Sequence, residues 1–207
     1  MKRIKQILLV HSGWFHPTLL ARWYFKRILK GMPGYCLTTV DSLESAAQLG
    51  FENFQAVVVY LHKEKVSLKV LNKFSSYISK GGGLVGVHSA TASFKEEDLW
   101  FQIMGGRFSG HGPIETIHYQ KSKASESAFR DESDFWVVDE LYRHDLQPGV
   151  QPIYEADYEG EKQPMVWIYN YGEGRVFYAC PGHKAAVFRN PVYRRVLRKG
   201  LDWVCSR

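Results

Sequence analysis

The chain has 207 residues, 45% of them apolar, which is enough for one sizeable core, so we expect a single domain over residues 1–207. Its apolar runs are too short to cross a bilayer and its amino-terminal segment lacks a signal-peptide pattern, so no membrane partner is expected. Its three cysteines form no CxxC pair, which favours reduced thiols in a cytoplasmic protein. The net charge of +6 raises the question of a nucleic-acid partner, which depends on where the charges lie.

The first half of the chain alternates strand-like and helix-like segments. Apolar runs predict strands at residues 4–10, 35–40, 55–61 and 84–87, and the intervening periodicity predicts helices at 17–30, 41–48 and 66–80. Continuous apolar strands separated by helices are typical of a parallel sheet covered on both faces. In such sheets ligands bind beyond the carboxyl ends of the strands, so polar residues that follow a strand are the first candidates for a site.

The second half has a different pattern, with strands and turns and little helix before the last segment. Strands are predicted at residues 114–120, 135–138, 151–158, 165–169 and 175–179. We therefore expect an α/β fold with a mostly parallel sheet and antiparallel strands added at one edge. Uncovered edges of that kind could be paired in a homodimer.

The last segment is predicted to be an amphipathic helix that begins at Asn190 and Pro191. Its apolar residues recur at helical spacing, at Tyr193, Val196, Leu197, Leu201 and Val204. Residues 184–207 hold seven Lys or Arg residues and one Asp, a difference equal to the whole net charge of +6. Because the basic residues fall mostly on the opposite face, they indicate a solvated helix, and no nucleic-acid partner is expected.

The stretch GGGLVGVHSAT, residues 81–91, places a histidine where a nucleophile usually stands. Its Gly-Val-His-Ser-Ala segment has the small-x-X-x-small frame of a strained strand-to-helix turn that exposes its central side chain, here His88. His88 could be catalytic, or it could be a buried histidine satisfied by backbone groups. Ser89 is a weaker candidate nucleophile, because Val87, two residues before it, is larger than such a turn prefers.

Other histidines also follow predicted strands or lie in glycine-rich segments: His11, His16, His62, His111 and His183. Because the carboxyl ends of parallel strands meet at one edge, several of these imidazoles are expected to converge there. His16 could face the same pocket or could cap and pack the following helix. His62, His118 and His144 are interpreted as surface histidines.

Five motifs in order resemble those of the trehalose-utilisation, or ThuA-like, family. They are GGGLVGVHSAT, Trp100 with GGRFSGHGP, DELY at 139–142, Pro164 with Trp167, and YGEGRVFY followed by PGH at 181–183. The resemblance covers nearly the whole chain and implies the fold of class I glutamine amidotransferases, a flavodoxin-like three-layer sandwich. In active amidotransferases of that fold, the strained turn presents a cysteine that a histidine from a late strand activates.

In this chain, His88 resembles the residue at the first of those positions, and His183 resembles the residue at the second. An imidazole cannot replace the thiolate that attacks a glutamine amide, so glutaminase activity is not expected. His88, His183 and Glu140 are the predicted catalytic residues. Together with His111 they could act as general acid and base on a sugar. Alternatively, two or three of these imidazoles and Glu140 could hold a divalent metal such as zinc with an open coordination position. The sequence contains no HxH or HExxH pair to separate these alternatives.

Five further residues are predicted to contact the substrate: Ser89, Arg107, His111, Trp167 and His16. Arg107 could anchor a hydroxyl-rich or anionic ligand or tie down its own loop, and Trp167 could stack on a sugar or belong to the core. The family's association with trehalose and related disaccharides implies a small-molecule carbohydrate ligand. The expected function is a lyase, hydrolase or isomerase reaction on a disaccharide or 3-keto-glycoside, and the alternative is a non-catalytic carbohydrate or metabolite binder with a relict amidotransferase pocket.

Overall fold

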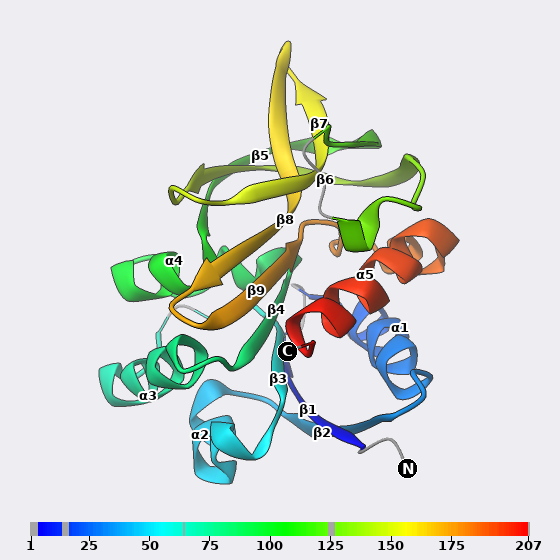
Figure 1. Ribbon diagram of the computed structural model, residues 1–207. Coiled ribbons are helices and arrows are strands. Elements are labelled where there is room, and N and C mark those ends of the chain that lie inside the picture. Colours follow the sequence, from blue (N-terminus) through cyan, green and yellow to red (C-terminus); the bar gives the residue numbers. More distant parts are fainter. Residues whose placement is uncertain (1–3, 14–16, 64, 124–126, 207) are drawn as a thin grey trace.

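The computed structural model describes residues 4–13, 17–63, 65–123 and 127–206, and its nine strands form one mixed sheet. The strand order is β2-β1-β3-β4-β9-β8-β7-β5-β6 (Figure 1). In this order, the first five strands (β2, β1, β3, β4 and β9) are parallel to one another. Each later pairing (β9 with β8, β8 with β7, β7 with β5 and β5 with β6) is antiparallel. The predicted α/β class, with antiparallel strands added at one edge of a parallel sheet, is confirmed.

The parallel half comprises β1 (Lys5–Ser12), β2 (Tyr35–Val40), β3 (Ala56–Leu61), β4 (Gly83–Val87) and β9 (Gly174–Ala179). Every residue of β3 and β4 is buried, as their continuous apolar sequences predict. The carboxyl ends of these strands meet at one edge of the sheet, which lies beneath β5 and β6 in Figure 1.

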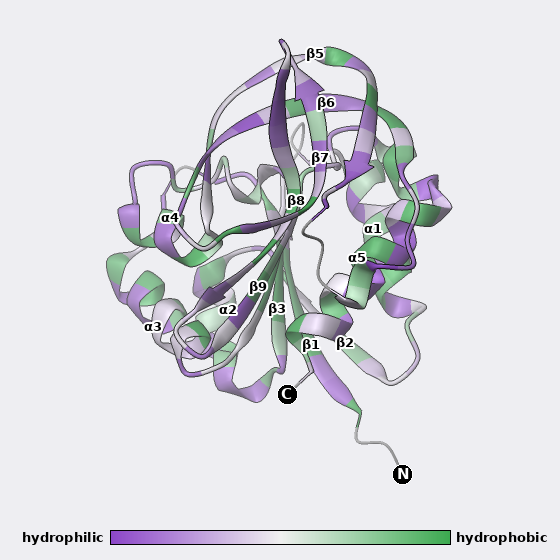
Figure 2. Cartoon of the chain, turned by 45° about the horizontal axis from the view of Figure 1, so that its top comes forward, coloured by the Kyte–Doolittle hydropathy of each residue, from purple (hydrophilic) through white to green (hydrophobic). Residues whose placement is uncertain are grey.

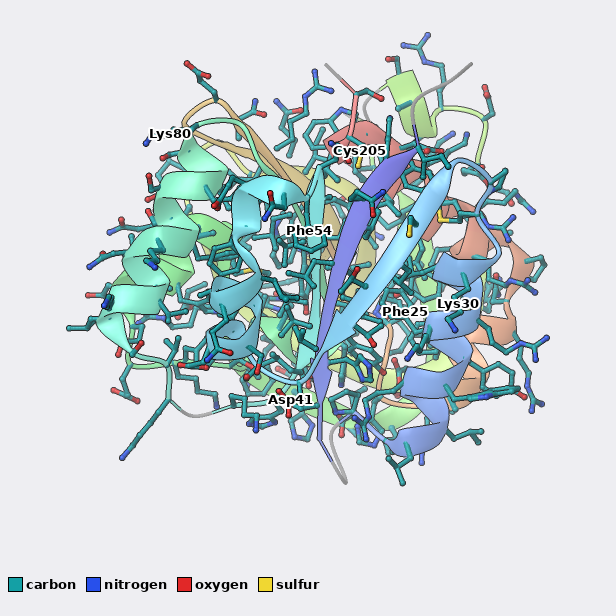
Figure 3. The ribbon with its side chains drawn as sticks, turned by 90° about the horizontal axis from the view of Figure 1, so that it is seen from below. Phe25, Lys30, Asp41, Phe54, Lys80 and Cys205 are labelled. Atoms are coloured by element: carbon teal, nitrogen blue, oxygen red, sulfur yellow. The ribbon has the colours of Figure 1, made fainter. Side chains whose placement is uncertain are left out.

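Helices cover both faces of the parallel half. Seen from below, α1 (Leu19–Lys30) and α5 (Pro191–Val204) lie on one side of the strands, and α2 (Leu43–Leu49) and α3 (Leu68–Ser79) lie on the other (Figure 3). Asn190 caps α5 by accepting a hydrogen bond from the Tyr193 amide, with Pro191 in the first turn, as predicted. The predicted apolar face of α5 is buried. None of the helices described is long and apolar enough to span a membrane.

The antiparallel half consists of β5 (Gly106–Lys121), β6 (Phe135–Leu146), β7 (Gln151–Tyr158) and β8 (Glu161–Tyr171). We define the paired β5 and β6 as the ribbon, which crosses above the carboxyl ends of β4 and β9 (Figures 1 and 2). The interpretation of the glycine-rich segment around Arg107 as a loop is wrong, because residues 106–113 are the first part of β5. Two register shifts, at Phe108/Gly110 and His111/Ile114, interrupt the strand periodicity there.

A short helix, α4 (Asp98–Met104), lies between β4 and the ribbon and was not predicted from the sequence. It buries Trp100, Ile103 and Met104 and ends at Gly105, whose φ of 73° is left-handed. The residue before it, Glu97, makes no capping hydrogen bond with its side chain. A seven-residue helix without that start signal is difficult to distinguish from a loop in the sequence.

Candidate active site

His88 stands at the end of β4, in the one-turn helix η2 (His88–Ala90), with a φ of 46°. A non-glycine residue rarely adopts this left-handed conformation, so the strained turn that the sequence frame predicts is present. The Tyr178 hydroxyl donates a hydrogen bond of 2.8 Å to the His88 carbonyl. Gly182 passes so close that a Cβ there would lie 2.5 Å from the His88 Cβ. Surrounding structure therefore holds the turn in place.

The side chain of His88 is fully buried, which corrects the expectation that the turn exposes it. Its Nδ1 lies 2.8 Å from the Cys180 carbonyl oxygen and its Nε2 lies 2.9 Å from the Tyr142 hydroxyl. Because a carbonyl only accepts, Nδ1 carries a proton, and in a neutral ring Nε2 then keeps its lone pair. Burial raises the pKa of Tyr142 well above its usual value, so its hydroxyl keeps its proton and donates to Nε2.

Glu140 on β6 and His183 after β9 lie beside His88. The Glu140 Oε2 atom is 3.2 Å from the His183 Nδ1 and 3.8 Å from the His88 Nε2. One ligand atom from each of these residues lies within 4.8 Å of the others. Glu140 is nearly buried and His183 is partly exposed, so solvent reaches the group from the His183 side. The structure thus brings the three predicted catalytic residues together, and we call them the triad; their catalytic role stays a prediction.

Asp139 fixes the segment that bears His183, and the sequence reasoning did not assign it a role. Its buried carboxylate accepts hydrogen bonds from the backbone amides of Gly182 at 2.6 Å, His183 at 3.2 Å and Lys184 at 2.8 Å. Burial raises its pKa to about 6, and the three hydrogen bonds oppose that rise. The only indication of its role in the sequence is that Asp139 is an acidic residue directly before Glu140.

The triad has the donor chemistry and spacing of a metal site. Zinc binds histidine nitrogen at about 2.0–2.1 Å and carboxylate oxygen at about 2.0–2.2 Å, so tetrahedral ligand atoms lie about 3.3 Å apart. The separations of 3.2 and 3.8 Å around Glu140 are close to that value. The Nδ1–H of His88 donates to a backbone carbonyl, which is how metal-bound imidazoles are usually oriented. Tyr142 competes for the Nε2 lone pair and would have to release it to an ion.

Of the predicted substrate-contacting residues, Ser89 is buried and Arg107 is tied to its neighbours. Ser89 is fully buried, and its Oγ has no hydrogen-bond partner among the residues that the structure describes. Arg107 pairs with Asp98 at 2.5 Å, and its guanidinium lies 4.7 Å from the ring centroid of Phe101. The tie between Arg107 and its neighbours matches the alternative in which this arginine anchors its own loop.

The other three predicted contacts differ in their placement. His111 is exposed at the edge of the site, with its ring centroid 6.3 Å from that of Tyr142. Trp167 is fully buried, stacks on Tyr178 at 4.0 Å and donates to the Met104 carbonyl at 3.2 Å, so its ring belongs to the core in this structure. His16 lies outside the described residues.

His144 is not the surface residue that the sequence interpretation expects. Its Nε2 lies 3.2 Å from the Thr91 hydroxyl and 3.3 Å from the Tyr178 hydroxyl, and its ring packs edge-on against Trp167. Burial lowers the pKa of His144 to about 3, so the ring is neutral. The expectation fails because β6 extends through residue 146 and turns this side chain toward the sheet. His62 is exposed, as expected.

A family model described as ThuA, trehalose utilisation, matches residues 6–204. The chain belongs to the ThuA family. The resemblance inferred from the five sequence motifs is therefore confirmed. No curated protein matches the chain's sequence.

Solved structures share the fold of this ThuA-family chain. A ThuA-like protein from Parabacteroides merdae has a TM-score of 0.86 and 18% identity, covering 99% of this chain and 91% of that one. A ThuA-like protein from Bacteroides uniformis has a TM-score of 0.81 and 16% identity, with coverages of 98% and 91%. A β-galactosidase from a Rahnella species has a TM-score of 0.67 and 10% identity, covering 95% of this chain and 31% of the galactosidase. At these identities the likeness concerns the fold alone.

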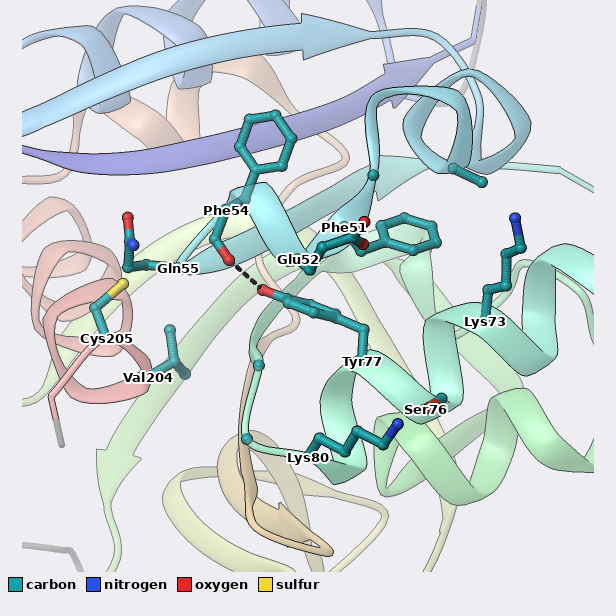
Figure 4. Close-up of a pocket in the computed structure, with 14 residues that line it drawn as sticks. Phe51, Glu52, Phe54, Gln55, Lys73, Ser76, Tyr77, Lys80, Val204 and Cys205 are labelled. Atoms are coloured by element: carbon teal, nitrogen blue, oxygen red, sulfur yellow. Dashed lines mark hydrogen bonds between the residues drawn. The ribbon is translucent and has the colours of Figure 1, made fainter.

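A hollow of about 820 Å³ lies at the opposite end of the sheet, near the amino ends of β3 and β4 (Figure 4). Phe51, Tyr77 and Val204 contribute to its lining, and the Tyr77 hydroxyl donates to the Phe54 carbonyl. Ligands of open α/β sheets bind at the carboxyl ends of the strands. Because the triad lies at that end, this hollow is separate from the candidate active site.

Proposed function

We propose that this ThuA-family protein is an enzyme of sugar metabolism that acts on an oxidised glycoside at the triad. The carrying observation is that two imidazoles and a carboxylate from β4, β6 and the segment after β9 lie within 4.8 Å of one another. The family description, trehalose utilisation, supports a sugar as the substrate class. Within that class we propose a 3-keto-glycoside, because its carbonyl offers an oxygen to polarise and acidifies the neighbouring C–H bond.

We propose that His88 Nε2, Glu140 Oε2 and His183 Nδ1 hold a divalent cation such as zinc. When bound, the cation would polarise the substrate carbonyl and so favour an elimination, hydration or isomerisation. The chain's own part is positioning: the Cys180 carbonyl fixes the tautomer of His88, and Asp139 fixes the segment of His183. Tyr142, once released from Nε2, would offer a protonated hydroxyl within the same site.

The test is turnover of 3-keto-trehalose by the wild type and by His88→Ala and His183→Ala. We expect each substitution to lower turnover at least about 100-fold while the fold is kept, because positioned acid–base and metal groups contribute factors of that size. His62→Ala, which changes an exposed histidine after β3, is the matched control and should stay within about twofold. Full activity in both triad variants would refute the proposal. Activity that survives chelation but is lost in the variants would replace the cation by imidazole acid–base chemistry.

We propose the finer fold assignment as well, a flavodoxin-like three-layer sandwich of the class I glutamine amidotransferase type. The parallel order β2-β1-β3-β4-β9 supports it, because flavodoxin-like sheets have this order, and the strained turn at His88 supports it further. Glutaminase chemistry is not proposed. The turn offers no thiol, and burial raises the pKa of the Cys180 thiol far above its usual range.

We also propose a reducing, cytoplasmic setting for the protein. Cys36, Cys180 and Cys205 are free thiols, and Cys36 is exposed. An exposed free thiol persists where glutathione and thioredoxin keep cysteines reduced. Location of a tagged chain in intact cells would test this proposal, and recovery from the periplasm or medium would contradict it.

A further inference from the structure

The ribbon carries a row of exposed apolar side chains next to the triad. Trp136 and Val138 on β6 are 59% and 51% exposed, and Ile114 on β5 is 43% exposed. Single exposed apolar residues are ordinary on protein surfaces, but a contiguous group commonly marks a binding surface. Because this group lies close to Glu140, we consider ligands that could contact both the row and the triad.

The row and Glu140 share one face of the ribbon. Along β6, Trp136, Val138 and Glu140 alternate with buried residues, so their side chains point to the same side. The register pairs these three residues across the ribbon, without a shift, with His118, Thr116 and Ile114 respectively. At about 3.4 Å per residue, Val138 lies roughly 7 Å and Trp136 roughly 14 Å from Glu140 along the strand. The row therefore begins beside the triad and ends at an indole ring.

The indole ring of Trp136 is held in place from one side. It stacks on the imidazole of His118, with ring centroids 3.6 Å apart and planes 5° apart. His118 is itself held by Gln120, 3.3 Å from its Nδ1, and by Asp134, 3.6 Å from its Nε2. Because the indole is already ordered while much of its surface stays in solvent, binding a ligand there costs little side-chain entropy.

We propose that Trp136 and Val138 form a platform for the second ring of a disaccharide whose first ring reacts at the triad, beside Ile114. This inference rests on the proposed function. One face of a pyranose ring presents mainly C–H groups, which pack against an aromatic ring while the hydroxyls stay in water. The distance from Glu140 to Trp136 exceeds one sugar ring, so the indole contacts the neighbouring sugar. Trp136 is then a specificity-determining residue that distinguishes disaccharides from monosaccharides.

The kinetic test compares 3-keto-trehalose with 3-keto-glucose for the wild type, Trp136→Ala and Trp23→Ala. Trp23 is the matched control, because it is a tryptophan on α1 that is 50% exposed. We expect Trp136→Ala to raise KM for the disaccharide about tenfold, which corresponds to about 1.4 kcal/mol, and to leave kcat and the monosaccharide KM unchanged. Trp23→Ala should change neither. An unchanged ratio of the two KM values in Trp136→Ala would overturn the platform.

A third variant separates substrate binding from ribbon stability. His118→Ala removes the stacking partner but keeps the indole, so it matches any loss of stability without removing the platform. We expect it to retain a low disaccharide KM relative to Trp136→Ala. If the two variants weaken both substrates alike, Trp136 serves only the ribbon and the proposal is wrong.

A binding measurement separates failure of the platform from failure of the proposed function. Calorimetric titration with unoxidised trehalose needs no turnover, and we expect Trp136→Ala to weaken binding about tenfold relative to the wild type and Trp23→Ala. That result would support the platform even if no keto-sugar were consumed. Absent or equal binding in all three proteins would overturn it. A wild-type dimer that Trp136→Ala converts to a monomer, with trehalose binding unchanged, would assign this face to a second copy instead.

Discussion

The parallel and antiparallel halves of the sheet supply different parts of the candidate site. His88 and His183 come from the parallel half, at turns that directly follow β4 and β9. Glu140 comes from the middle of β6, in the ribbon that crosses the same edge (Figure 1). Parallel topology alone places the imidazoles, because every carboxyl end meets there. The ribbon adds the carboxylate and the exposed apolar row, which we propose select the ligand.

Asp139 links the two halves, and its loss should have the largest effect on stability. Asp139→Ala leaves the buried backbone amide of Gly182 and the partly buried amides of His183 and Lys184 without their acceptor. We expect the free energy of unfolding in urea to fall by about 3 kcal/mol or more, and turnover to fall because His183 is displaced. Asp145→Ala, an exposed acid on the same strand, should change stability by less than about 0.5 kcal/mol. Equal effects of the two substitutions would show that the halves are not joined through Asp139.

Because the pKa of Asp139 is raised, the free energy of unfolding should also depend on pH, by an amount similar to the effect of Asp139→Ala. Its pKa rises from an ordinary 3.8 to about 6, so the folded state binds this proton more tightly than the unfolded state. This tighter proton binding adds about 3 kcal/mol to the free energy of unfolding. The contribution is fully present below pH 3.8 and is lost as the pH rises through about 6. Asp139→Asn does not titrate, so the unfolding free energy of the wild type should fall relative to this variant between about pH 3.5 and 7. A constant difference across that range would contradict the assignment.

Tyr142 is a second link, because a residue of the ribbon restrains His88 of the parallel half. Tyr142→Phe removes the hydrogen bond to Nε2 and should lower the free energy of unfolding by about 1 kcal/mol. The same change frees the lone pair for an ion, so we expect zinc affinity in a competitive titration to rise by up to about tenfold. Weaker zinc binding in Tyr142→Phe would mean that Nε2 is not the ligand atom.

Arg107 lies at the start of β5 and should have the smallest effect. Its ion pair with Asp98 involves a mostly exposed carboxylate, and exposed pairs contribute less than about 1 kcal/mol. We expect Arg107→Ala to lower stability by no more than that and to leave KM for 3-keto-trehalose unchanged. A tenfold rise in KM would instead restore the substrate-anchoring role that the sequence allows.

The contrast between the halves also explains what the sequence could predict. The parallel strands are continuous apolar runs, and α5 has both a cap and a regular apolar face. The local sequence pattern was therefore sufficient to predict these elements. In β5 the glycines and two register shifts conceal the strand, and α4 lacks a side-chain cap. Those segments depend on tertiary contacts that periodicity does not encode.

The candidate site shows the same division. His88 and His183 could be inferred because each follows a predicted strand, and Glu140 because it lies in a motif. The roles of Asp139, Tyr142 and Trp136 depend on how the ribbon crosses the sheet edge, which decides the direction of each β6 side chain. His144 was misassigned for the same reason, because the predicted strand ended eight residues before the observed one, at 138 instead of Leu146.

The metal centre is tested most directly by the zinc stoichiometry and affinity of the purified protein and of three single variants, His88→Ala, Glu140→Gln and His183→Ala, each dialysed against zinc without chelator. We expect about one ion per wild-type chain and a loss of at least tenfold in affinity in each variant, whichever half of the sheet the changed residue belongs to. His62→Ala should bind as the wild type does. Unchanged zinc affinity after any one of the three is changed, or a wild type that binds none, would contradict a single metal centre built from both halves.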